Sequence, residues 1–544
     1  MEAQGARGRT MRYIHIHPRD NVLVALEDLK EGEQINLSEI DLSQMDQGQM
    51  AGKADAVSNP GQGNAYSNQP DTARDVSIRA GSLTLLEDVK RGHKVALTDI
   101  PAGGRVIKYG NPIAIAKEEI RAGAWVHTHN ARTALTETAD YHYDHQVFPL
   151  PELPERTFEG YRRADGRVAI RNEIWILPVV GCVNDIAGGL ARENQDLVQG
   201  NIEGMYSFAH PYGCSQLGGD LDATRRLLTS LVRHPNAAGV LCVFLGCENL
   251  TRELFLEALG DYNPDRVKFL VCQDVEDEYE EGRKLLKELA SYADRFKREP
   301  IPASELVVGL KCGGSDGLSG ITANPTVGRL SDRLIALGGS TVLTEVPEMF
   351  GAENILFARC KDQATFDKAV AMVNRFKKYF VDHGQTVYEN PSPGNKAGGI
   401  TTLEDKSCGC VQKGGSAQIV DVLDYACPVS KKGLNILYGP GNDLVSSTDL
   451  AASGAHMILF TTGRGTPFGA PVPTAKIATN SPLAARKKNW IDFNAGTVAD
   501  GLETLDQAGD RLLDFVLAVA SGQRTQAEKS GCRDIAIFKD GVTL

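Results

Sequence analysis

Histidine residues gather near the start of this chain, where their spacing fits metal chemistry. Seven of the eleven histidines lie in the first 145 residues. His15-Ile-His17 and His127-Thr-His129 each place two imidazoles at positions i and i+2, and a strand would turn both rings to one face. Imidazole is a frequent ligand of divalent metals. One such pair would carry little weight, but two pairs together with His93 indicate a metal site in one small module.

Four cysteines follow apolar, strand-like runs in turns that contain glycine. They are Cys182, Cys214, Cys247 and Cys312. Because α/β proteins place their sites at the carboxyl ends of strands, these thiols could ligate iron or an iron–sulfur cluster. No Cys-x-x-Cys spacing supports a cluster, and buried packing is the alternative. In the absence of an export signal, we expect all eleven cysteines to be reduced.

Three glycine-rich polar loops could bind a small anion. They read Cys312-Gly-Gly-Ser-Asp-Gly-Leu-Ser-Gly320, Asn390-Pro-Ser-Pro-Gly-Asn-Lys396 and Thr461-Thr-Gly-Arg-Gly-Thr-Pro467. Glycines let backbone N–H groups approach an anion, while Lys396 and Arg464 add positive charge. No loop matches the phosphate P-loop or the dinucleotide fingerprint, so a nucleotide cofactor is not supported. The side chains instead suit a hydroxyl-rich ligand that carries a carboxylate.

A short repeat indicates how the histidine-rich region folds. Asp28–Ile35 resembles Asp88–Val95, and weaker copies lie at 99–106 and 119–126. Each copy has an acidic residue, an apolar residue, a glycine turn and a strand-like run, and glycine supplies the positive φ that such turns need. We therefore predict a small β-module over residues 11–135, after a disordered tail at 1–10. Residues 37–80 are polar and rich in glycine, so we predict a flexible insertion there.

The rest of the chain reads differently. Three prolines in Phe148–Pro154 indicate a linker at 136–157. From residue 158 onward, apolar strand-like runs alternate with helical stretches, which predicts a parallel α/β layer. A helical spacer at 362–383 precedes a polar stretch, and we place a boundary there. The prediction is one α/β domain at 158–385 and a C-terminal α/β domain at 386–544.

Composition excludes several classes of partner. The net charge of −12 argues against broad binding to nucleic acid or to membrane surfaces, which needs clustered positive charge. No apolar run approaches the ~20 residues of a membrane span. The first ten residues lack the apolar core of a secretory signal. We expect a cytoplasmic protein that acts on a small molecule.

Several motifs resemble the altronate/galactarate dehydratase family. They include Gly92-His-Lys-Val-Ala-Leu97, Gly160-Tyr-Arg-Arg-Ala-Asp-Gly166, Gly246-Cys-Glu248, the 312–325 stretch, Asn390–Lys396 and Thr462–Pro467. The resemblance runs from Met11 to Leu544, apart from the insertion. It implies an α/β fold in which a small antifreeze-like β-clip domain precedes a larger α/β catalytic region of two subdomains. Thr344–Glu353 and Tyr388–Ile400 are more similar to the altronate branch than to the galactarate branch.

The resemblance implies a reaction and a cofactor. The reaction is loss of water from D-altronate to give 2-keto-3-deoxy-D-gluconate in hexuronate catabolism, with Fe²⁺ or Mn²⁺. Such an ion would stabilise charge on the substrate carboxylate while a base removes the C2 proton and an acid protonates the departing 3-hydroxyl. These roles require the N-terminal module to close over the α/β region, in the same chain or in a neighbouring one. We also expect a homo-oligomer.

We assign residues to these roles as a hypothesis. We expect the metal to be held or flanked by His17, His93, His127 and His129. The catalytic candidates are Lys94, Asp316 and Glu345, and the substrate-binding candidates are Asn324, Asn395, Lys396 and Arg464. Cys408, beside Cys410, departs from the family pattern and is interpreted as an incidental thiol.

Three alternatives stay open. Galactarate dehydration would be the same chemistry on a related sugar acid. A non-catalytic carbohydrate-binding protein would use the metal only to stabilise its N-terminal module. An iron–sulfur dehydratase would use the loop cysteines Cys182, Cys214, Cys247 and Cys312.

Overall fold

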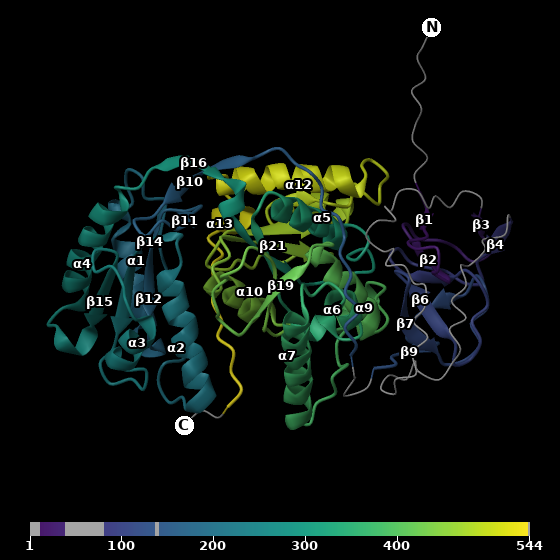
Figure 1. Cartoon of the computed structure of the whole chain (residues 1–544), viewed down its shortest axis with the longest axis horizontal. Coiled ribbons are helices and arrows are strands. Elements are labelled where there is room, and N and C mark those ends of the chain that lie inside the picture. The colour runs from purple at the N-terminus through teal and green to yellow at the C-terminus, as the bar shows by residue number, and fades with distance from the viewer. Residues whose placement is uncertain (1–10, 38–80, 136–140, 542–544) are drawn as a thin grey trace, which may run out of the picture.

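The computed structural model describes residues 11–37, 81–135 and 141–541 (Figure 1). A small β-rich module lies at one end, an α/β domain with a four-stranded sheet lies at the other, and a larger domain around a seven-stranded sheet lies between them. The predicted α/β class with a small N-terminal β-module is confirmed. The predicted tail at 1–10, nearly all of the predicted insertion and the start of the predicted linker lie outside the described residues.

Short antiparallel strands build the N-terminal module. In sheet order they are β1 (Tyr13–Ile14), β2 (Val22–Ala25), β5 (Lys94–Ala96) and β8 (Trp125–Val126); then β6 (Arg105–Lys108), β7 (Asn111–Ala116) and β9 (Ala131–Arg132); and the pair β3 (Gln34–Asn36) and β4 (Ser82–Thr84). Backbone bridges from Leu29 to Val89 and from Ile100 to Ile120 pair the repeat copies two by two. Each copy turns at a glycine with positive φ, as predicted: Gly32, Gly92, Gly103 and Gly123.

A parallel four-stranded sheet forms the core of the second domain. Its order is β13 (Gly204–Ser207), β12 (Glu173–Pro178), β14 (Ala237–Phe244) and β15 (Val267–Val271). Every residue of β14 is buried, which is typical of a parallel strand covered on both faces. One face packs against α1 (Asn184–Glu193) and α4 (Glu278–Ala293), and the other packs against α2 (Gly218–Arg233) and α3 (Arg252–Leu259).

A parallel sheet of seven strands forms the core of the largest domain. Its order is β19 (Ile419–Leu423), β20 (Gly433–Leu437), β18 (Ser340–Leu343), β17 (Val307–Cys312), β21 (Met457–Thr462), β22 (Thr474–Ala478) and β23 (Phe493–Asn494). Over one face pack α5 (Ala323–Ala336) and α12 (Leu505–Ala520), while α10 (Asp443–Ala452) packs on the other. The remaining α-helices of the described residues are α6 (Glu353–Phe357), α7 (Gln363–Asp382), α8 (Pro393–Ala397), α9 (Leu403–Cys410), α11 (Ser481–Arg486) and α13 (Gln526–Lys529).

The structure differs from the predicted boundary between residues 385 and 386. Strands β17 and β18 precede that point and β19 to β23 follow it, yet all of them belong to one sheet. β18 pairs with β20, and β17 pairs with β21. The predicted spacer forms α7, which packs against β19 and so belongs to this domain. The chain passes from one parallel sheet to the other between β15 and β17.

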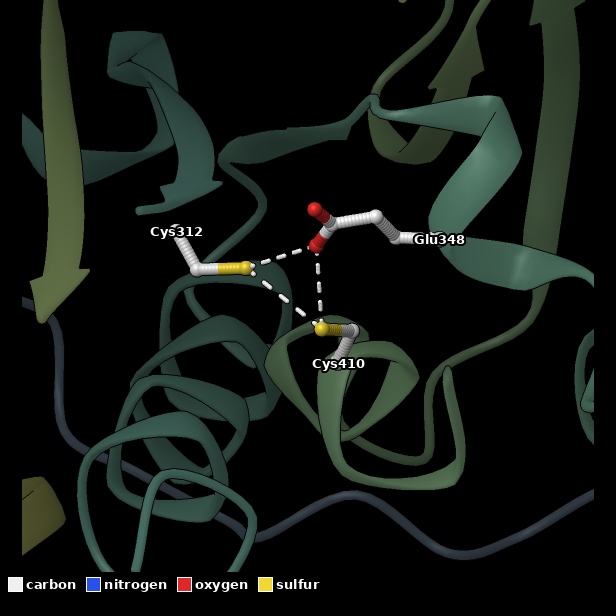
Figure 2. A group of neighbouring side chains, drawn as sticks. All are labelled: Cys312, Glu348 and Cys410. Atoms are coloured by element: carbon white, nitrogen blue, oxygen red, sulfur yellow. Dashed lines mark hydrogen bonds between the residues drawn. The ribbon is translucent and has the colours of Figure 1, made fainter. Parts of the chain in front are cut away.

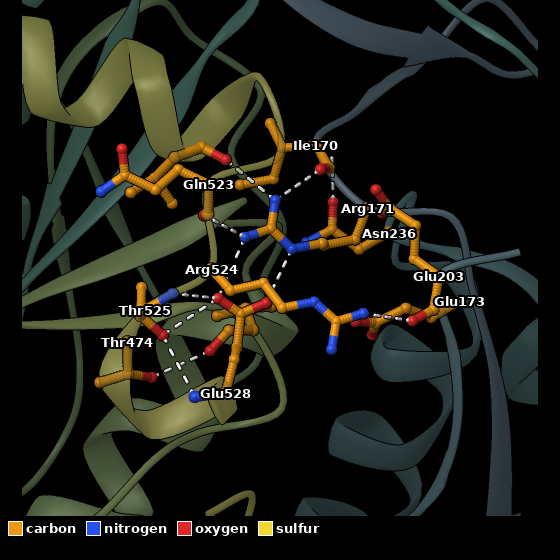
Figure 3. Close-up of polar contacts among 12 residues, drawn as sticks. Ile170, Arg171, Glu173, Glu203, Asn236, Thr474, Gln523, Arg524, Thr525 and Glu528 are labelled. Atoms are coloured by element: carbon orange, nitrogen blue, oxygen red, sulfur yellow. Dashed lines mark hydrogen bonds and ion pairs between the residues drawn. The ribbon is translucent and has the colours of Figure 1, made fainter. Parts of the chain in front are cut away.

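A small antiparallel sheet and buried ion pairs join the two α/β domains. The sheet has the order β11 (Val168–Ala169), β10 (Thr157–Arg162) and β16 (Arg298–Pro302), and β10 packs against α12. Arg171 donates to both carboxylate oxygens of Glu528, at 2.7 and 3.0 Å, and to the Gln523 carbonyl (Figure 3). Arg533 donates in the same two-pronged way to Glu173, at 2.7 and 2.8 Å. Because these pairs are buried and bidentate, they fix the orientation of the two domains.

Within the described part of the chain, every helix is too short or too polar to span a membrane.

Candidate active site

The N-terminal module contacts the largest domain along residues 390–410, where α8 and α9 lie. Each helix begins with a side-chain cap. The Ser392 hydroxyl accepts from the Asn395 N–H, and the Thr402 hydroxyl accepts from the Asp405 N–H. Part of the polar character of this segment is therefore explained by the two helix starts.

Glycines permit the close approach of the module to the glycine-rich loop after β17. A Cβ on Gly317 would lie 1.9 Å from the Gly92 carbonyl oxygen, far inside van der Waals contact. On the other side of this contact, Gly317 N–H donates to the Gly398 carbonyl at 2.7 Å. The sequence predicts that the loop containing Gly317 binds an anion. The structure instead uses Gly317 where two backbones meet between domains.

A buried carboxylate between two lysines joins the same two parts. Lys94 of β5 donates to Asp405 Oδ2 at 2.7 Å and to the Gly399 carbonyl at 2.7 Å, and Lys108 of β6 donates to Asp405 Oδ1 at 3.2 Å. None of these three side chains is more than 2% exposed. Burial lowers the pKa of Lys94 to about 8, against the opposing charge of Asp405. Burial also acts to raise the pKa of Asp405, but the two lysines outweigh it and hold that pKa well below its usual range.

Two histidines of the module lie at this junction with their rings already engaged. Trp125 Nε1 donates to His93 Nδ1 at 3.0 Å, and His93 also hydrogen-bonds the backbone of Ala397 in α8. His127 Nδ1 lies 3.3 Å from Thr401 Oγ1. Burial lowers the pKa of both His93 and His127 to about 4, so both rings are neutral near pH 7.

Of the four histidines predicted to hold a metal, His93 and His127 lie together, with ring centroids 5.1 Å apart, but among the described residues the four do not form one group of ligands. The Trp125 ring contacts both His127 and His129, with centroid distances of 5.2 and 4.9 Å. His17 packs against Gly110, and its Nδ1 accepts from the backbone of Arg19. The expected strand geometry is absent because β1 ends at residue 14 and β8 ends at residue 126, before either His-x-His pair.

Two cysteines and a glutamate form a compact buried group (Figure 2). Cys312 ends β17, Glu348 lies in the turn after β18, and Cys410 ends α9. The two sulfur atoms are 3.5 Å apart, and each lies 3.1 Å from Glu348 Oε2. Across residues 11–37, 81–135 and 141–541, this is the only group of three histidine, cysteine or carboxylate side chains close enough to share one metal ion. Neither Glu348 nor Cys410 is among the site residues predicted from the sequence.

Glu345, a predicted catalytic residue, lies beside this group. Its backbone has a φ of 72°, in the left-handed region that non-glycine residues rarely adopt. The carboxylate is fully buried, pairs with Lys311 and Lys413, and accepts from the Cys312 N–H at 3.0 Å. Lys413 Nζ also lies 2.9 Å from the Cys312 sulfur. In this arrangement Glu345 fixes the surroundings of Cys312.

A small internal pocket lies between the lysine–aspartate cluster and the cysteine group. Its lining includes Lys108, Asp316, Asn324, Asp405, Lys406 and Cys410. The Asp316 carboxylate accepts from Thr479 Oγ1 at 2.9 Å, and burial raises its pKa. Asn324 donates to the Gly409 carbonyl at 3.0 Å and accepts from Thr461 at 2.6 Å. The structure thus brings two predicted site residues, Asp316 and Asn324, to one cavity.

The other predicted substrate-binding residues lie around α8. Asn395 is buried and donates to the Ser315 carbonyl at 2.8 Å, so it positions the loop after β17. Lys396 is half-buried and Arg464 is exposed. The Arg464 side chain approaches α8 at Gly394. These two residues place positive charge on the solvent side of the same segment.

The four loop cysteines fall into two separate sheets. Cys182, Cys214 and Cys247 are exposed and follow strands of the four-stranded sheet. Cys312 is buried in the seven-stranded sheet against Cys410. The set proposed for an iron–sulfur cluster is therefore divided between two domains.

Family comparisons cover this architecture part by part. The altronate/galactarate dehydratase SAF domain matches residues 67–134, and the second domain of D-galactarate dehydratase/altronate hydrolase matches residues 160–294. The C-terminal region of D-galactarate/altronate dehydratase matches residues 303–543. The chain is 50% identical over 539 residues to the altronate dehydratase of Escherichia coli (strain K12), which covers 98% of this chain and 100% of that relative. The chain belongs to the altronate/galactarate dehydratase family.

Other members of the altronate/galactarate dehydratase family differ in their sequence identity to this chain. The altronate dehydratase of Bacillus subtilis (strain 168) is 48% identical over 98% of this chain and 99% of its own length. The galactarate dehydratase (L-threo-forming) of E. coli is 36% identical over 85% of this chain and 93% of its own length. The predicted family membership is confirmed, and the junction between the module and the largest domain lies within the matched residues.

Proposed function

We propose that this protein is a hydro-lyase that dehydrates altronate. The observation that carries the proposal is the near-complete match to two altronate dehydratases at 50% and 48% identity, against 36% for a galactarate dehydratase. The small pocket gathers charged and amide side chains from three distant parts of the chain, and these are the types of group that a hydroxyl-rich carboxylate would need.

The reaction sets clear demands on a site. Removing the C2 proton and the C3 hydroxyl of an aldonic acid gives an enol, which becomes a 2-oxo-3-deoxy acid. A proton beside a carboxylate is only weakly acidic, so the developing negative charge needs cations placed in advance. One group must accept the proton, and another must donate a proton to the departing hydroxyl.

Asp316 is the proposed proton-transfer group. It lines the pocket, and burial raises its pKa, which makes its carboxylate a stronger base near neutral pH. Lys108 and Lys406 line the same pocket. Burial acts to lower the pKa of each lysine, but a carboxylate partner outweighs it and raises both above the usual value. Both lysines therefore stay protonated and supply the cationic charge for the substrate carboxylate and the enol.

The remaining predicted residues take supporting roles in this proposal. Lys94, predicted as a base, lies behind Asp405 with no exposed surface and positions that carboxylate. Lys396 and Arg464 attract the sugar acid from the solvent side. Glu345 positions Cys312 through its N–H.

An Fe²⁺ or Mn²⁺ ion would supply further positive charge at the substrate carboxylate. The four predicted histidines do not fit such an ion. His93 Nδ1 already accepts a hydrogen bond from Trp125, and the same ring is bound to the Ala397 backbone. His17 lies apart, against Gly110, whereas His129 contacts the Trp125 ring that His93 and His127 also contact.

A substrate comparison tests the proposal. The purified full chain is incubated anaerobically with D-altronate or galactarate and with added Fe²⁺ or Mn²⁺, and the 2-oxo product is identified by carbonyl derivatisation and mass. We expect kcat/KM for altronate to exceed that for galactarate by at least about 10-fold. Equal turnover of galactarate would overturn the choice of substrate. Tight sugar-acid binding with no product under either ion would favour the non-catalytic alternative.

A matched pair of variants tests the role of Asp316. We expect Asp316→Asn to lower kcat by about 10²- to 10⁴-fold, the range for loss of a general acid or base. The control is Asp222→Asn, which removes a half-exposed carboxylate on α2 that pairs with Arg225 three residues along. A kcat for Asp316→Asn within threefold of the control would remove Asp316 from the chemistry.

A further inference from the structure

We propose that Cys312, Glu348 and Cys410 bind one divalent iron ion beside the internal pocket. The three side chains come from a strand end, a turn and a helix end that are 36 to 98 residues apart in the chain. All three are buried, and their ligand atoms point toward one another (Figure 2). The inference concerns ion binding by these residues and holds whichever sugar acid is the substrate.

The spacing of the three ligand atoms fits a metal. The Cys312 and Cys410 sulfurs are 3.5 Å apart, and each is 3.1 Å from Glu348 Oε2, so the point in their plane that is equidistant from all three atoms lies about 1.9 Å from each. Metal–sulfur bonds of about 2.3 Å and metal–oxygen bonds of about 2.0–2.2 Å are slightly longer than this. An ion would therefore sit about 1 Å out of the plane of the three atoms, or the triangle would widen by a few tenths of an ångström. Either arrangement is a three-ligand site with a further position open.

The cluster of side chains around the group has no net charge without an ion, and it would have none with one. Three lysines face three carboxylates here: Lys311, Lys406 and Lys413 against Glu345, Glu348 and Asp443. With both thiols protonated, the cluster is neutral. A divalent ion that displaces the two thiol protons leaves the same net charge, which is how thiol ligands take up metal.

Neighbouring lysines hold the ligands in place. Lys406 Nζ donates to Glu348 Oε1 at 2.7 Å, which leaves Oε2 directed at the two sulfurs. Lys413 Nζ donates to the Cys312 sulfur at 2.9 Å. Hydrogen bonds of this kind to the ligands orient a metal site and tune its affinity.

The donor set distinguishes between the two expected ions. Two thiolates and one carboxylate are soft to borderline ligands, which suit iron or zinc, whereas manganese prefers carboxylate, carbonyl and water oxygens. Among the two ions that the family resemblance implies, the group therefore selects Fe²⁺. Cys410 also lines the internal pocket that Asp316 and Lys108 line, so the ion would lie at the pocket wall.

Cobalt absorbance tests the site without any turnover. Co²⁺ is titrated anaerobically into the reduced, metal-free full chain, and thiolate-to-cobalt charge-transfer absorbance is followed in the near ultraviolet. We expect saturation at one Co²⁺ per chain, displacement by Fe²⁺ or Zn²⁺, and little displacement by the same concentration of Mn²⁺. Cys410→Ser and Cys312→Ser should abolish the band.

Matched controls separate the group from other thiols and from the histidines. Cys408→Ser changes a buried thiol of the same helix that lies outside the group, and it should retain the band. His93→Asn should retain the band as well. If the serine variants do not fold by circular dichroism, Lys406→Met keeps all three ligands and should weaken Co²⁺ binding by about 10- to 100-fold.

Three results would overturn the inference. The first is a native chain that binds Co²⁺ with no charge-transfer band. The second is a folded Cys410→Ser variant with the full band. The third is a Cys312–Cys410 disulfide that forms in air and whose reduction restores no Co²⁺ binding. None of these measurements depends on altronate turnover, so failure of this site and failure of the proposed function are distinguishable.

Discussion

Replacement of Asp405 by asparagine tests whether the buried lysine–aspartate cluster holds the N-terminal module on the largest domain. Asparagine keeps the size and one acceptor oxygen but removes the charge that Lys94 and Lys108 share. Lys94 and Lys108 would then lie in a fully buried site without the counter-charge that keeps both protonated. Loss of one partner from a buried ion pair costs about 3–5 kcal/mol. We expect the free energy of unfolding at pH 6 to fall by this amount.

The loss should depend on pH in a defined direction. The folded pKa of Lys94 is about 8, below the value of about 10.4 in an unfolded chain. Without Asp405 that folded pKa falls further, so below pH 8 the variant gives up a proton that the native cluster keeps. The free energy of unfolding of the variant therefore falls, relative to that of the native chain, by about 1.4 kcal/mol for each pH unit below 8. Above pH 8 Lys94 is neutral in both folded proteins, and this part of the difference disappears.

The assay is urea unfolding of the native chain and the variant at pH 6, 7, 8 and 9, followed by circular dichroism. The gap between them should shrink by about 1.4 kcal/mol per unit from pH 6 to pH 8 and then level off. Asp88→Asn is the control, because Asp88 forms an exposed pair with Lys30, and it should cost less than about 1 kcal/mol at every pH. Adding Lys94→Met to Asp405→Asn should restore stability at pH 6.

Two outcomes would refute this reasoning. One is a loss below about 1 kcal/mol at pH 6, which would mean that the cluster is not desolvated as the structure shows. The other is an equal loss at pH 6 and pH 9, which would mean that Lys94 does not carry the effect.

Three further changes have defined expectations. Burial lowers the pKa of His456 to about 4, so its contribution to stability is complete above pH 6.5 and lost toward pH 4, by up to about 3 kcal/mol, and His456→Gln should flatten urea midpoints over that range. Gly317→Ala should lower the melting temperature and free the module, because its Cβ would meet the Gly92 carbonyl, whereas Gly219→Ala on α2 has open space and should be neutral or slightly stabilising. Arg464→Ala should raise KM for altronate and leave the melting temperature unchanged, since the side chain is exposed; an unchanged KM would exclude it from substrate attraction.

Local patterns predicted the strands, helices and turns of this fold better than they predicted how these elements are grouped into domains. The turn repeat gave glycines at positive φ, and alternating strands and helices gave parallel sheets. The boundary at 385 did not match because α7 reads as a spacer along the chain but packs on the sheet in space. Parallel strands need long crossovers, so a sheet can continue beyond a stretch that looks like a linker.

In the candidate site too, local patterns predicted some residues and missed others that only the tertiary fold brings together. Asp316 and Asn324 could be singled out because they sit in an unusual polar, glycine-rich loop. The geometry predicted for the His-x-His pairs is absent, because an i, i+2 spacing places two side chains on one face only within a strand, and both strands end before the pairs. Glu348 and Cys410 carry no local signal. Only tertiary contacts across 62 residues bring them together.

The ion pairs between Arg171 and Glu528 and between Arg533 and Glu173 have a consequence for synthesis of the chain. Each pair joins residues that are about 360 positions apart. A ribosome adds about 5–20 residues per second, so Arg171 and Glu173 wait tens of seconds for their partners. During that interval the nascent second domain carries charged side chains that it cannot bury without large cost. Packing of the second domain against the largest domain is therefore completed only when the last residues have been translated. A chain truncated near its C-terminus should fail to complete this packing.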